Sequence, residues 1–274
     1  MKSTFERKQV VEWCDEGAIP PEYNADSDFV FRMMGPRTIR ALSPSPRDVA
    51  LDVACGLGIE VVSMAKQGVR VVGVDVSKIM VRKAKRYVAG CGVEADIVQG
   101  ASECLPFRDN ALDALICKGA LDHFHYPRRS ILEFARVLKP NGKAVISVAN
   151  MESLGFKLAR LIDAAGLSGL RKGERRPWDM PEDHTLRVDY KTLKAYTQGA
   201  LRANHIEGLS LFWSLPHWGK LLDKLPKRMS YIMLNTLDLI ARKLPAISDI
   251  IIFRGQPEKG RRHESPLRSN FRYR

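Results

Sequence analysis

The sequence contains no long apolar run. No segment of its 274 residues approaches the roughly 18–20 apolar residues that a membrane-spanning helix needs. The first ten residues carry mixed charge and no apolar segment, so we expect no secretory signal. Both absences argue against an integral helical membrane protein and predict a chain that works in the cytoplasm.

Paired cysteines are also lacking. Cys14, Cys55, Cys91, Cys104 and Cys117 are scattered, and no two of them form a Cys-x-x-Cys motif. No group of histidines and cysteines has the spacing of a zinc site either. We therefore expect reduced thiols, no disulfide framework and no metal.

Negative charge is scarce in the second half of the chain. The net charge is +13, of which +3 falls in residues 1–150 and +10 in residues 151–274. This bias predicts an anionic partner, such as a phospholipid surface, an acidic substrate or nucleic acid, unless the charge serves only solubility.

Apolar runs and helical patterns alternate regularly after a Pro- and Ser-rich stretch at residues 42–46. The expected strands are residues 49–54, 70–75, 94–99, 111–118 and 143–149, and the expected helices are 59–67, 78–89 and 128–138. Such alternation predicts an α/β fold, with a parallel sheet and helices on both faces.

The second half is less regular. Helices are expected over residues 152–165 and 190–204, and strands over 206–213 and 248–254. We predict an N-terminal helical cap and linker over 1–47, one domain over 48–254, and a basic disordered tail over 255–274. The domain has insertions at about 151–186 and 214–247, and the second of these has helical periodicity.

The sharpest local signal is a glycine turn after the first strand. Gly56 and Gly58 lead from the strand into a helix, where a ligand can pass close to the backbone and meet free N–H groups. Asp75 ends the second strand 19 residues after Gly56 and can accept hydrogen bonds from both hydroxyls of a ribose. A dinucleotide site needs a third glycine where this chain has Val61, which disfavours a nicotinamide cofactor.

Residues 51–58 and 72–80 resemble the first two motifs of the class I S-adenosylmethionine (SAM)-dependent methyltransferases, in particular the group that includes the ubiquinone and menaquinone methyltransferases. Residues 99–107, 110–115 and 138–143 resemble later motifs of that family, in the same order. The resemblance covers about residues 48–150, with a weaker similarity at 183–206. It implies SAM as the cofactor and a Rossmann-like, seven-stranded, mostly parallel sheet, whose last strand is antiparallel and follows a helical insertion.

The same resemblance implies roles for individual residues. Asp52 would orient the glycine turn and contact the methionine amino group, Asp75 would bind the ribose hydroxyls, and Val76 would pack on the adenine. Lys118 would lie beside the methionyl end. The other expected cofactor positions are Ala54, Cys55, Gly56, Gly58, Ala101 and Ser102.

Two of these positions depart from the family pattern. The family usually has glycine at the position of Ala54, and it often has aspartate at the position of Ala101, where a carboxylate accepts a hydrogen bond from the adenine amine. That contact is lost here unless Ser102 or a backbone carbonyl replaces it.

Two histidines are candidate catalytic bases. His123 follows the fourth strand, on the side of an open α/β sheet where ligands bind, and His184 lies in a segment that resembles an acceptor-side loop of the family. Both residues also fit a purely structural role in a turn. The stretch after the fourth strand lacks the Asn/Asp-Pro-Pro-Tyr/Phe motif, which disfavours methylation of DNA bases.

The 214–247 insertion places Trp218, close behind Trp213, beside a basic amphipathic pattern. This pattern is typical of a membrane-surface helix or a lid over a hydrophobic substrate, and it also fits a helix pair packed on the domain. We therefore expect methyl transfer to O or C of a small hydrophobic acceptor, such as a quinone, an isoprenoid or a lipid precursor. The insertion adds the alternative of peripheral contact with the inner face of the membrane.

Two alternative functions remain from the sequence. A tRNA or rRNA methyltransferase would use the basic second half, although no recognised RNA-binding module accompanies it, so nucleic acid is the less favoured partner. A non-catalytic SAM-binding or interaction module would explain the alanines at positions 54 and 101. The sequence predicts no oligomeric state.

Overall fold

The computed structural model describes residues 24–169, 176, 179, 184–213 and 215–258, and within them seven strands form one sheet. The strand order is β3-β2-β1-β4-β5-β7-β6. Strands β1 to β5 run parallel, and β7 is antiparallel to both β5 and β6, as predicted. The strands are β1 (Val49–Val53), β2 (Arg70–Asp75), β3 (Asp96–Gln99), β4 (Leu112–Lys118), β5 (Leu138–Ala149), β6 (Leu201–Leu209) and β7 (Ile250–Pro257).

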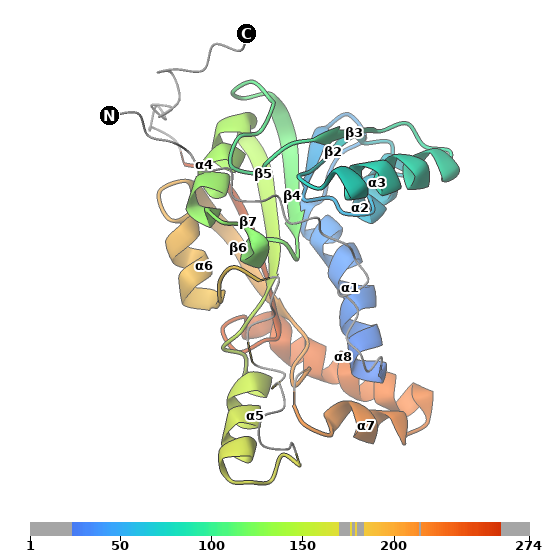
Figure 1. Cartoon of the computed structure of the whole chain (residues 1–274), viewed down its shortest axis with the longest axis vertical. Coiled ribbons are helices and arrows are strands. Elements are labelled where there is room, and N and C mark those ends of the chain that lie inside the picture. Colours follow the sequence, from blue (N-terminus) through green and yellow to red (C-terminus); the bar gives the residue numbers. More distant parts are fainter. Residues whose placement is uncertain (1–23, 170–175, 177–178, 180–183, 214, 259–274) are drawn as a thin grey trace.

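Helices cover both faces of the sheet (Figure 1). One face packs against α1, α2, α3 and α8, and the other against α4 and α6. The helices are α1 (Ala25–Leu42), α2 (Ile59–Ala65), α3 (Lys78–Gly90), α4 (Pro127–Val137), α5 (Leu154–Ala164), α6 (Tyr190–Thr197), α7 (Trp218–Asp223) and α8 (Lys227–Lys243), with a short 3-10 helix η2 (Leu121–His123). None of the helices described is both long and apolar enough to cross a membrane.

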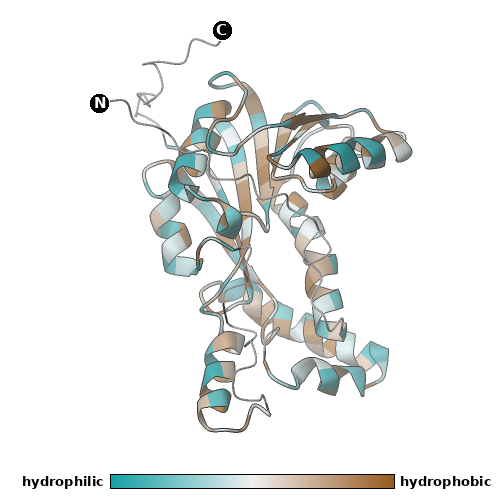
Figure 2. Ribbon diagram, in the orientation of Figure 1, coloured by the Kyte–Doolittle hydropathy of each residue, from teal (hydrophilic) through white to brown (hydrophobic). Residues whose placement is uncertain are grey.

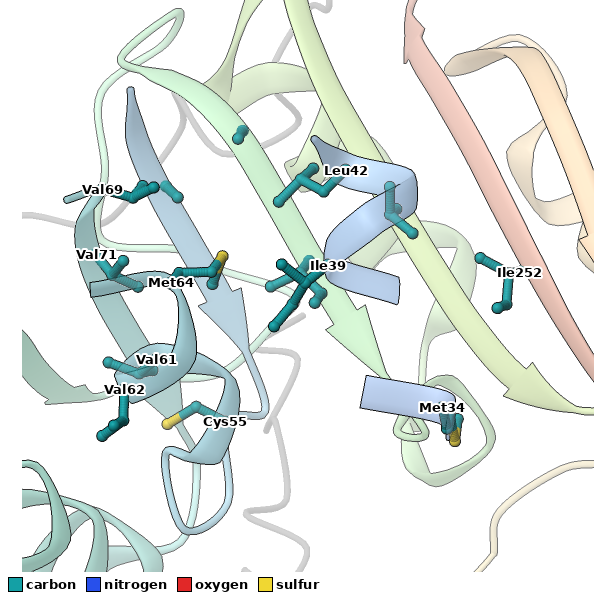
Figure 3. Close-up of a cluster of buried hydrophobic side chains, with 14 of the residues drawn as sticks. Met34, Ile39, Leu42, Cys55, Val61, Val62, Met64, Val69, Val71 and Ile252 are labelled. Atoms are coloured by element: carbon teal, nitrogen blue, oxygen red, sulfur yellow. The ribbon is translucent and has the colours of Figure 1, made fainter. Parts of the chain in front are cut away.

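The core has two halves because successive side chains of a strand point to opposite faces. Ala50 packs in the cluster under α1 and α2, whereas its neighbour Leu51 packs in the cluster under α4. In the first cluster, Ile39 and Leu42 of α1 meet the sheet (Figure 3). Burial on both faces explains why the inner strands read as continuous apolar runs rather than alternating ones.

Helix α1 is part of this domain rather than a separate cap. It begins at Asn24, whose side chain accepts a hydrogen bond from the backbone N–H of Ser27, and it packs against β4 and β5. Residues 25–42 of the segment predicted as a helical cap and linker over 1–47 are thus helical, and they contribute to the main core. Residues 1–23 and the tail after 258 lie outside the described residues.

Three predicted boundaries in the second half are wrong. The helix expected over 190–204 ends at Thr197, because Gly199 adopts a positive φ of 73° and starts a turn into β6. Strand β6 therefore begins at Leu201 instead of residue 206. Strand β7 continues to Pro257, past the expected limit at 254, because residues 255–257 pair with β6.

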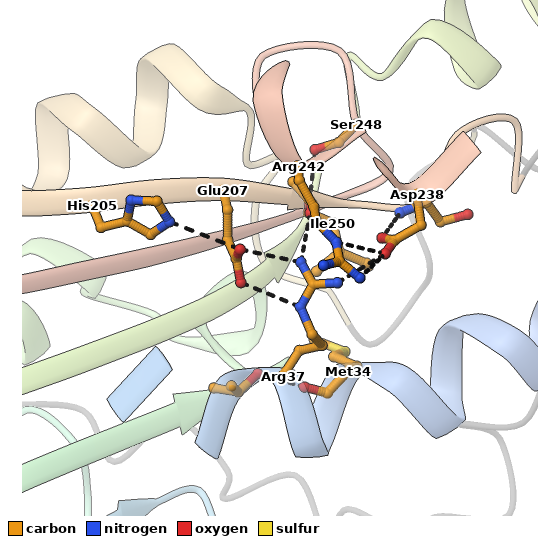
Figure 4. A network of polar contacts seen from close by, with 11 residues as sticks. Met34, Arg37, His205, Glu207, Asp238, Arg242, Ser248 and Ile250 are labelled. Carbon is orange, nitrogen blue, oxygen red and sulfur yellow. Dashed lines mark hydrogen bonds and ion pairs between the residues drawn. The ribbon is translucent and has the colours of Figure 1, made fainter. Parts of the chain in front are cut away.

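Buried charges join α1 to the last part of the chain (Figure 4). Arg37 of α1 is 2% exposed. Its guanidinium lies 2.9 Å from the carboxylate of Asp238 in α8 and 3.2 Å from that of Glu207 in β6. Arg242 contacts the same Asp238 oxygen at 2.8 Å. Two cations and two anions thus balance one another between α1, α8 and β6.

Candidate functional site

The strand order reverses between β1 and β4, and their carboxyl ends lie side by side at that edge. In open α/β sheets, ligands bind outside the carboxyl ends of the strands at such a switch point. The glycine turn after β1, the acid at the end of β2 and η2 after β4 all lie along this edge. The fold thus gathers most of the predicted site residues from separate parts of the sequence.

The glycine turn has the backbone geometry of a ligand cradle. Ala54, Gly56 and Gly58 have positive φ angles of 55°, 50° and 78°. A Cβ added to Gly56 would meet no heavy atom of the described residues within 4 Å, so this residue faces open space. The backbone at Gly56 thus leaves room for a ligand to pass close to it.

The Asp75 carboxylate is held by the turn that it faces. It is 7% exposed, and it accepts hydrogen bonds from the backbone N–H of Gly56 at 2.9 Å and of Ser77 at 2.8 Å. A carboxylate offers about four acceptor positions, a capacity that exceeds these two backbone bonds. Val76 beside it is 46% exposed, which leaves an apolar surface next to the carboxylate.

The Asp52 carboxylate lies behind the glycine turn without a partner for one oxygen. Its Oδ2 atom is buried and accepts no hydrogen bond from the residues that the structure describes. Burial raises the pKa of Asp52 well above its usual value, repulsion from Glu60 raises it further, and Lys118 opposes both effects. An orphaned carboxylate oxygen of this kind fits an ammonium donor, such as the methionine amino group of SAM.

Lys118 lies at the end of β4 and pairs with a residue that sequence reasoning missed. Its ammonium group is 2.8 Å from Oε1 of Glu60, in the first turn of α2. The edge therefore holds three carboxylates, those of Asp52, Glu60 and Asp75, against one lysine. This excess of negative charge favours a cationic ligand.

Two predicted cofactor residues do not face the open edge with their side chains. Cys55 is 6% exposed, and its thiol packs in the core beside Val61 (Figure 3). Burial raises the pKa of this thiol far above its usual value. Only its backbone, which donates to the carbonyl of Val74 at 3.0 Å, can shape the site.

Ser102 is likewise turned towards α4. Its hydroxyl lies 2.9 Å from that of Ser130 and 3.0 Å from a carboxylate oxygen of Glu103. The hydroxyl is thus committed to protein partners and is poorly placed to replace the carboxylate missing at Ala101.

The two predicted catalytic histidines lie together. The rings of His123 and His184 meet edge to face with centroids 4.4 Å apart. Nδ1 of His184 is 3.2 Å from Oδ2 of Asp122, which is only 3% exposed. Thr185 fixes this arrangement, because its backbone N–H donates to the carbonyl of Asp122 at 2.9 Å and its hydroxyl to that of Phe124 at 2.8 Å.

Asp122 is the second residue that sequence reasoning missed. The sequence shows it directly before His123, but nothing local indicates that His184, 62 positions later, closes on its carboxylate. The prediction of no metal rested on spacing alone. The fold brings Asp122, His123 and His184 together so that one potential ligand atom from each lies within 4.8 Å of the others.

Comparison with known families supports a methyltransferase domain, as the sequence motifs predicted. The family described as "Methyltransferase domain" matches residues 51–146. A demethylmenaquinone methyltransferase of Clavibacter sepedonicus is 35% identical over 109 residues, which cover 40% of this chain and 44% of that protein. A ubiquinone biosynthesis O-methyltransferase of Xanthomonas oryzae is 34% identical over 110 residues, covering 40% and 46%. The matches thus span less than half of these two relatives.

Solved structures show the same fold. The YcgJ protein of Bacillus subtilis is similar with a TM-score of 0.54 at 20% identity, covering 83% of this chain and 99% of that one. The PH0226 protein of Pyrococcus horikoshii has a TM-score of 0.57 at 17% identity, covering 90% and 100%. Residues 51–146 thus form a methyltransferase domain, for which SAM is the cofactor.

Proposed function

We propose that this protein transfers the methyl group of SAM to an oxygen or carbon atom of a small hydrophobic acceptor, such as a quinone, an isoprenoid or a lipid precursor. The observation that carries the proposal is the juxtaposition of two sites at one sheet edge. The cradle of Gly56, Asp75 and Asp52 lies at the ends of β1 and β2, and the His123–His184 pair follows the adjacent β4. The acceptor class is supported by the names of two relatives, a demethylmenaquinone methyltransferase and a ubiquinone biosynthesis O-methyltransferase.

Different residues of the chain serve the cofactor and the acceptor. Bound SAM supplies an electrophilic methyl group. Asp75 holds the ribose, Asp52 receives the amino group, and the acidic edge favours the cationic cofactor over its neutral product. Positioning supplies most of the rate, because the acceptor atom must lie in line with the methyl group.

His184 is the better placed of the two candidate bases. Asp122 lies beside Nδ1 of its ring, which orients the imidazole and stabilises the cation that forms when Nε2 takes a proton. The side chain is 15% exposed, so it can still be approached. His123 packs against it edge to face and fixes the second side of the ring.

Equilibrium binding of SAM tests the cofactor part. Asp75→Ala removes the acceptor of two hydrogen bonds, each contributing about 1.5–3 kcal/mol to a charged group, so affinity should fall by about a hundredfold or more. Asp75→Asn keeps the shape and should fall less. Asp96→Ala, an exposed acid of β3, is the control and should bind as the unchanged protein does. Unaltered affinity in Asp75→Ala would contradict the ribose assignment.

The acceptor part needs a different measurement. We would incubate the protein with a cell extract and SAM carrying a labelled methyl group, and then separate organic, aqueous and macromolecular fractions. Label in the organic fraction supports a hydrophobic acceptor. Label confined to RNA would instead favour a nucleic-acid methyltransferase, and no label at all with intact SAM binding would favour a non-catalytic module.

We further propose that α7 and α8 contact an anionic membrane surface, from which a hydrophobic acceptor would be taken. Met229, Ile232 and Leu239 on the outer side of α8 are between 54% and 58% exposed, and Leu221 of α7 is 52% exposed. Lysines and arginines flank these apolar side chains at both ends of α8, and its one acid, Asp238, is buried. Figure 2 shows apolar and polar residues mixed along both helices. Exposed apolar groups bordered by cations fit a bilayer with acidic headgroups.

Vesicle sedimentation tests this surface. The protein should bind vesicles that contain phosphatidylglycerol more strongly than vesicles of phosphatidylcholine alone, and high salt should weaken binding. The double substitution Ile232→Glu and Leu239→Glu should abolish it. Tyr87→Glu, at an exposed position of α3, is the matched control. Equal binding by the double variant would refute a role for α8.

A further inference from the structure

Asp122, His123 and His184 form a compact group at the acceptor side of the site. Among the residues that the structure describes, they are the group in which three potential metal ligands lie within 4.8 Å of one another. Two come from η2, directly after β4, and the third comes from a segment that Thr185 fastens to η2. The backbone N–H of Thr185 donates to the carbonyl of Asp122 at 2.9 Å, and its hydroxyl donates to the same carbonyl at 3.0 Å. The group is therefore held by the backbone and not by flexible side chains alone.

The Asp122 carboxylate has the environment of a ligand rather than of a surface acid. Its side chain is 5% exposed. Oδ1 is buried and accepts no hydrogen bond from the described residues, while Oδ2 lies 3.2 Å from Nδ1 of His184. A buried carboxylate oxygen without a hydrogen bond destabilises the folded state by about 1–3 kcal/mol or more. Its presence here therefore favours a partner from outside the chain.

The distances between donors suit a metal ion. Zinc lies about 2.0–2.2 Å from imidazole nitrogen and carboxylate oxygen, so two ligands of a tetrahedral ion are about 3.4 Å apart. The separation of 3.2 Å between His184 and Asp122 fits this value. Nε2 of His123 lies 3.9 Å from Oδ1 of Asp122, somewhat farther apart than two ligands of one zinc ion.

The donor set points to a class of metal. Two imidazoles and one carboxylate suit first-row transition metals such as zinc or iron, whereas magnesium and calcium prefer sites made of oxygen. Three protein ligands leave at least one position open, as in catalytic rather than structural zinc sites. The histidine side chains are 21% and 15% exposed, so a small molecule can reach that position.

We propose that Asp122, His123 and His184 bind one divalent transition-metal ion, whose open position takes the acceptor oxygen. Its purpose rests on the methyltransferase function proposed above. With a metal bound, His184 would be a ligand and not the base. The metal would instead lower the pKa of a hydroxyl bound to it, so that the hydroxyl releases its proton to solvent. The oxygen then attacks the methyl carbon while the carbon–sulfur bond breaks, and the electron pair stays on the sulfur of the leaving S-adenosylhomocysteine. This assigns an oxygen rather than a carbon acceptor.

The test measures metal binding directly, with Zn²⁺ as the probe. The full chain is treated with a chelator, desalted and titrated with Zn²⁺ against a chromophoric competitor. We expect one strong site in the unchanged protein. Asp122→Asn keeps the shape of the side chain, and His184→Ala removes a ligand, and each should weaken binding at least about tenfold, the smaller effect known for supporting contacts of metal sites. His205→Ala, at a histidine in β6 whose side chain is 59% exposed, is the matched control.

SAM binding is measured on the same samples, so that the two proposals fail separately. The metal proposal is supported if zinc binding falls in Asp122→Asn and His184→Ala, stays unchanged in His205→Ala, and SAM binding persists in all of them. It is overturned if the unchanged protein binds no zinc at one equivalent, or if Asp122→Asn binds zinc as tightly as the unchanged protein. Either result leaves the SAM site to be judged by the Asp75 variants.

Discussion

The cofactor edge and the α1–α8 junction place their charges in opposite ways. At the cofactor edge, Asp75 contacts the backbone of Gly56, 19 residues away, whereas Arg37 of the junction contacts Asp238, 201 residues away. The first is built from neighbouring pieces of one βαβ unit. The α1–α8 junction forms only when the two ends of the described chain have come together.

The charge balance of the two regions differs as well. The junction pairs Arg37 and Arg242 with Asp238 and Glu207, so its buried charges cancel. The cofactor edge sets Asp52, Glu60 and Asp75 against Lys118 alone. A balanced buried group is structural, while an unbalanced one beside open space needs an outside partner of opposite charge. The difference therefore separates scaffold from binding site.

Breaking the junction should have the largest effect. Arg37→Leu leaves the fully buried carboxylate of Asp238 with Arg242 as its remaining cation, and removing one partner of a buried pair costs about 3–5 kcal/mol. We expect this loss in the free energy of unfolding measured by urea denaturation. Residual folded protein should still bind SAM, because none of the cofactor residues lies in the junction.

A pair with an exposed cation and a largely buried acid supplies the control. Arg32 contacts Asp28 at 2.6 Å one turn apart on α1, and its side chain is 69% exposed. Arg32→Leu should change stability by less than about 1 kcal/mol. If the two leucine variants were equally stable, the buried network would not hold α1 to α8.

The start of α1 should make stability depend on pH. Burial raises the pKa of Asp26 from 3.8 to about 8, and repulsion from Asp249 adds to this effect. The unfolded carboxyl ionises near pH 4, so between about pH 4 and 8 folding takes up a proton, and the stability from this group falls as pH rises.

Thermal unfolding from pH 5 to pH 8 checks this sign. The melting temperature of the unchanged protein should fall by several degrees more than that of Asp26→Asn, which cannot ionise. Asp96→Asn, at an exposed site on β3, should follow the unchanged protein. Parallel curves for Asp26→Asn and the unchanged protein would show that the Asp26 carboxyl is not protonated in the folded state.

The sequence predicted the cofactor edge far better than the element boundaries in the second half of the chain. Local signals were enough for β1, β2 and the glycine turn, because strand, turn and helix follow one another within 30 residues. The end of α6 at Thr197 and the length of β7 depend on strand pairing, which residues 190–204 and 255–257 do not reveal locally. Tertiary pairing there overrides helical spacing and polar composition.

The same limit applied to the site. Asp75 and Gly56 could be named from their positions, whereas Glu60 and Asp122 could not, because their roles come from Lys118 and His184. Side-chain direction was a further limit. Cys55 and Ser102 lie in the right segments, yet their side chains point into the protein. A motif thus specifies the path of the backbone better than the contacts of each residue.

The smallest expected effect lies in the glycine turn. Ala54 has a φ of 55°, in the left-handed region, which costs a residue with a Cβ about 1–2 kcal/mol. Ala54→Gly removes this strain but gains chain entropy in the unfolded state worth about 0.4–1 kcal/mol, so the net change should be a stabilisation of up to about 1 kcal/mol. Ala65→Gly, at the last residue of α2, should instead lose up to about 1 kcal/mol. Denaturation midpoints that move in opposite directions would confirm that the turn is strained where the family has glycine, and a shared loss would show that Ala54 is accommodated without strain.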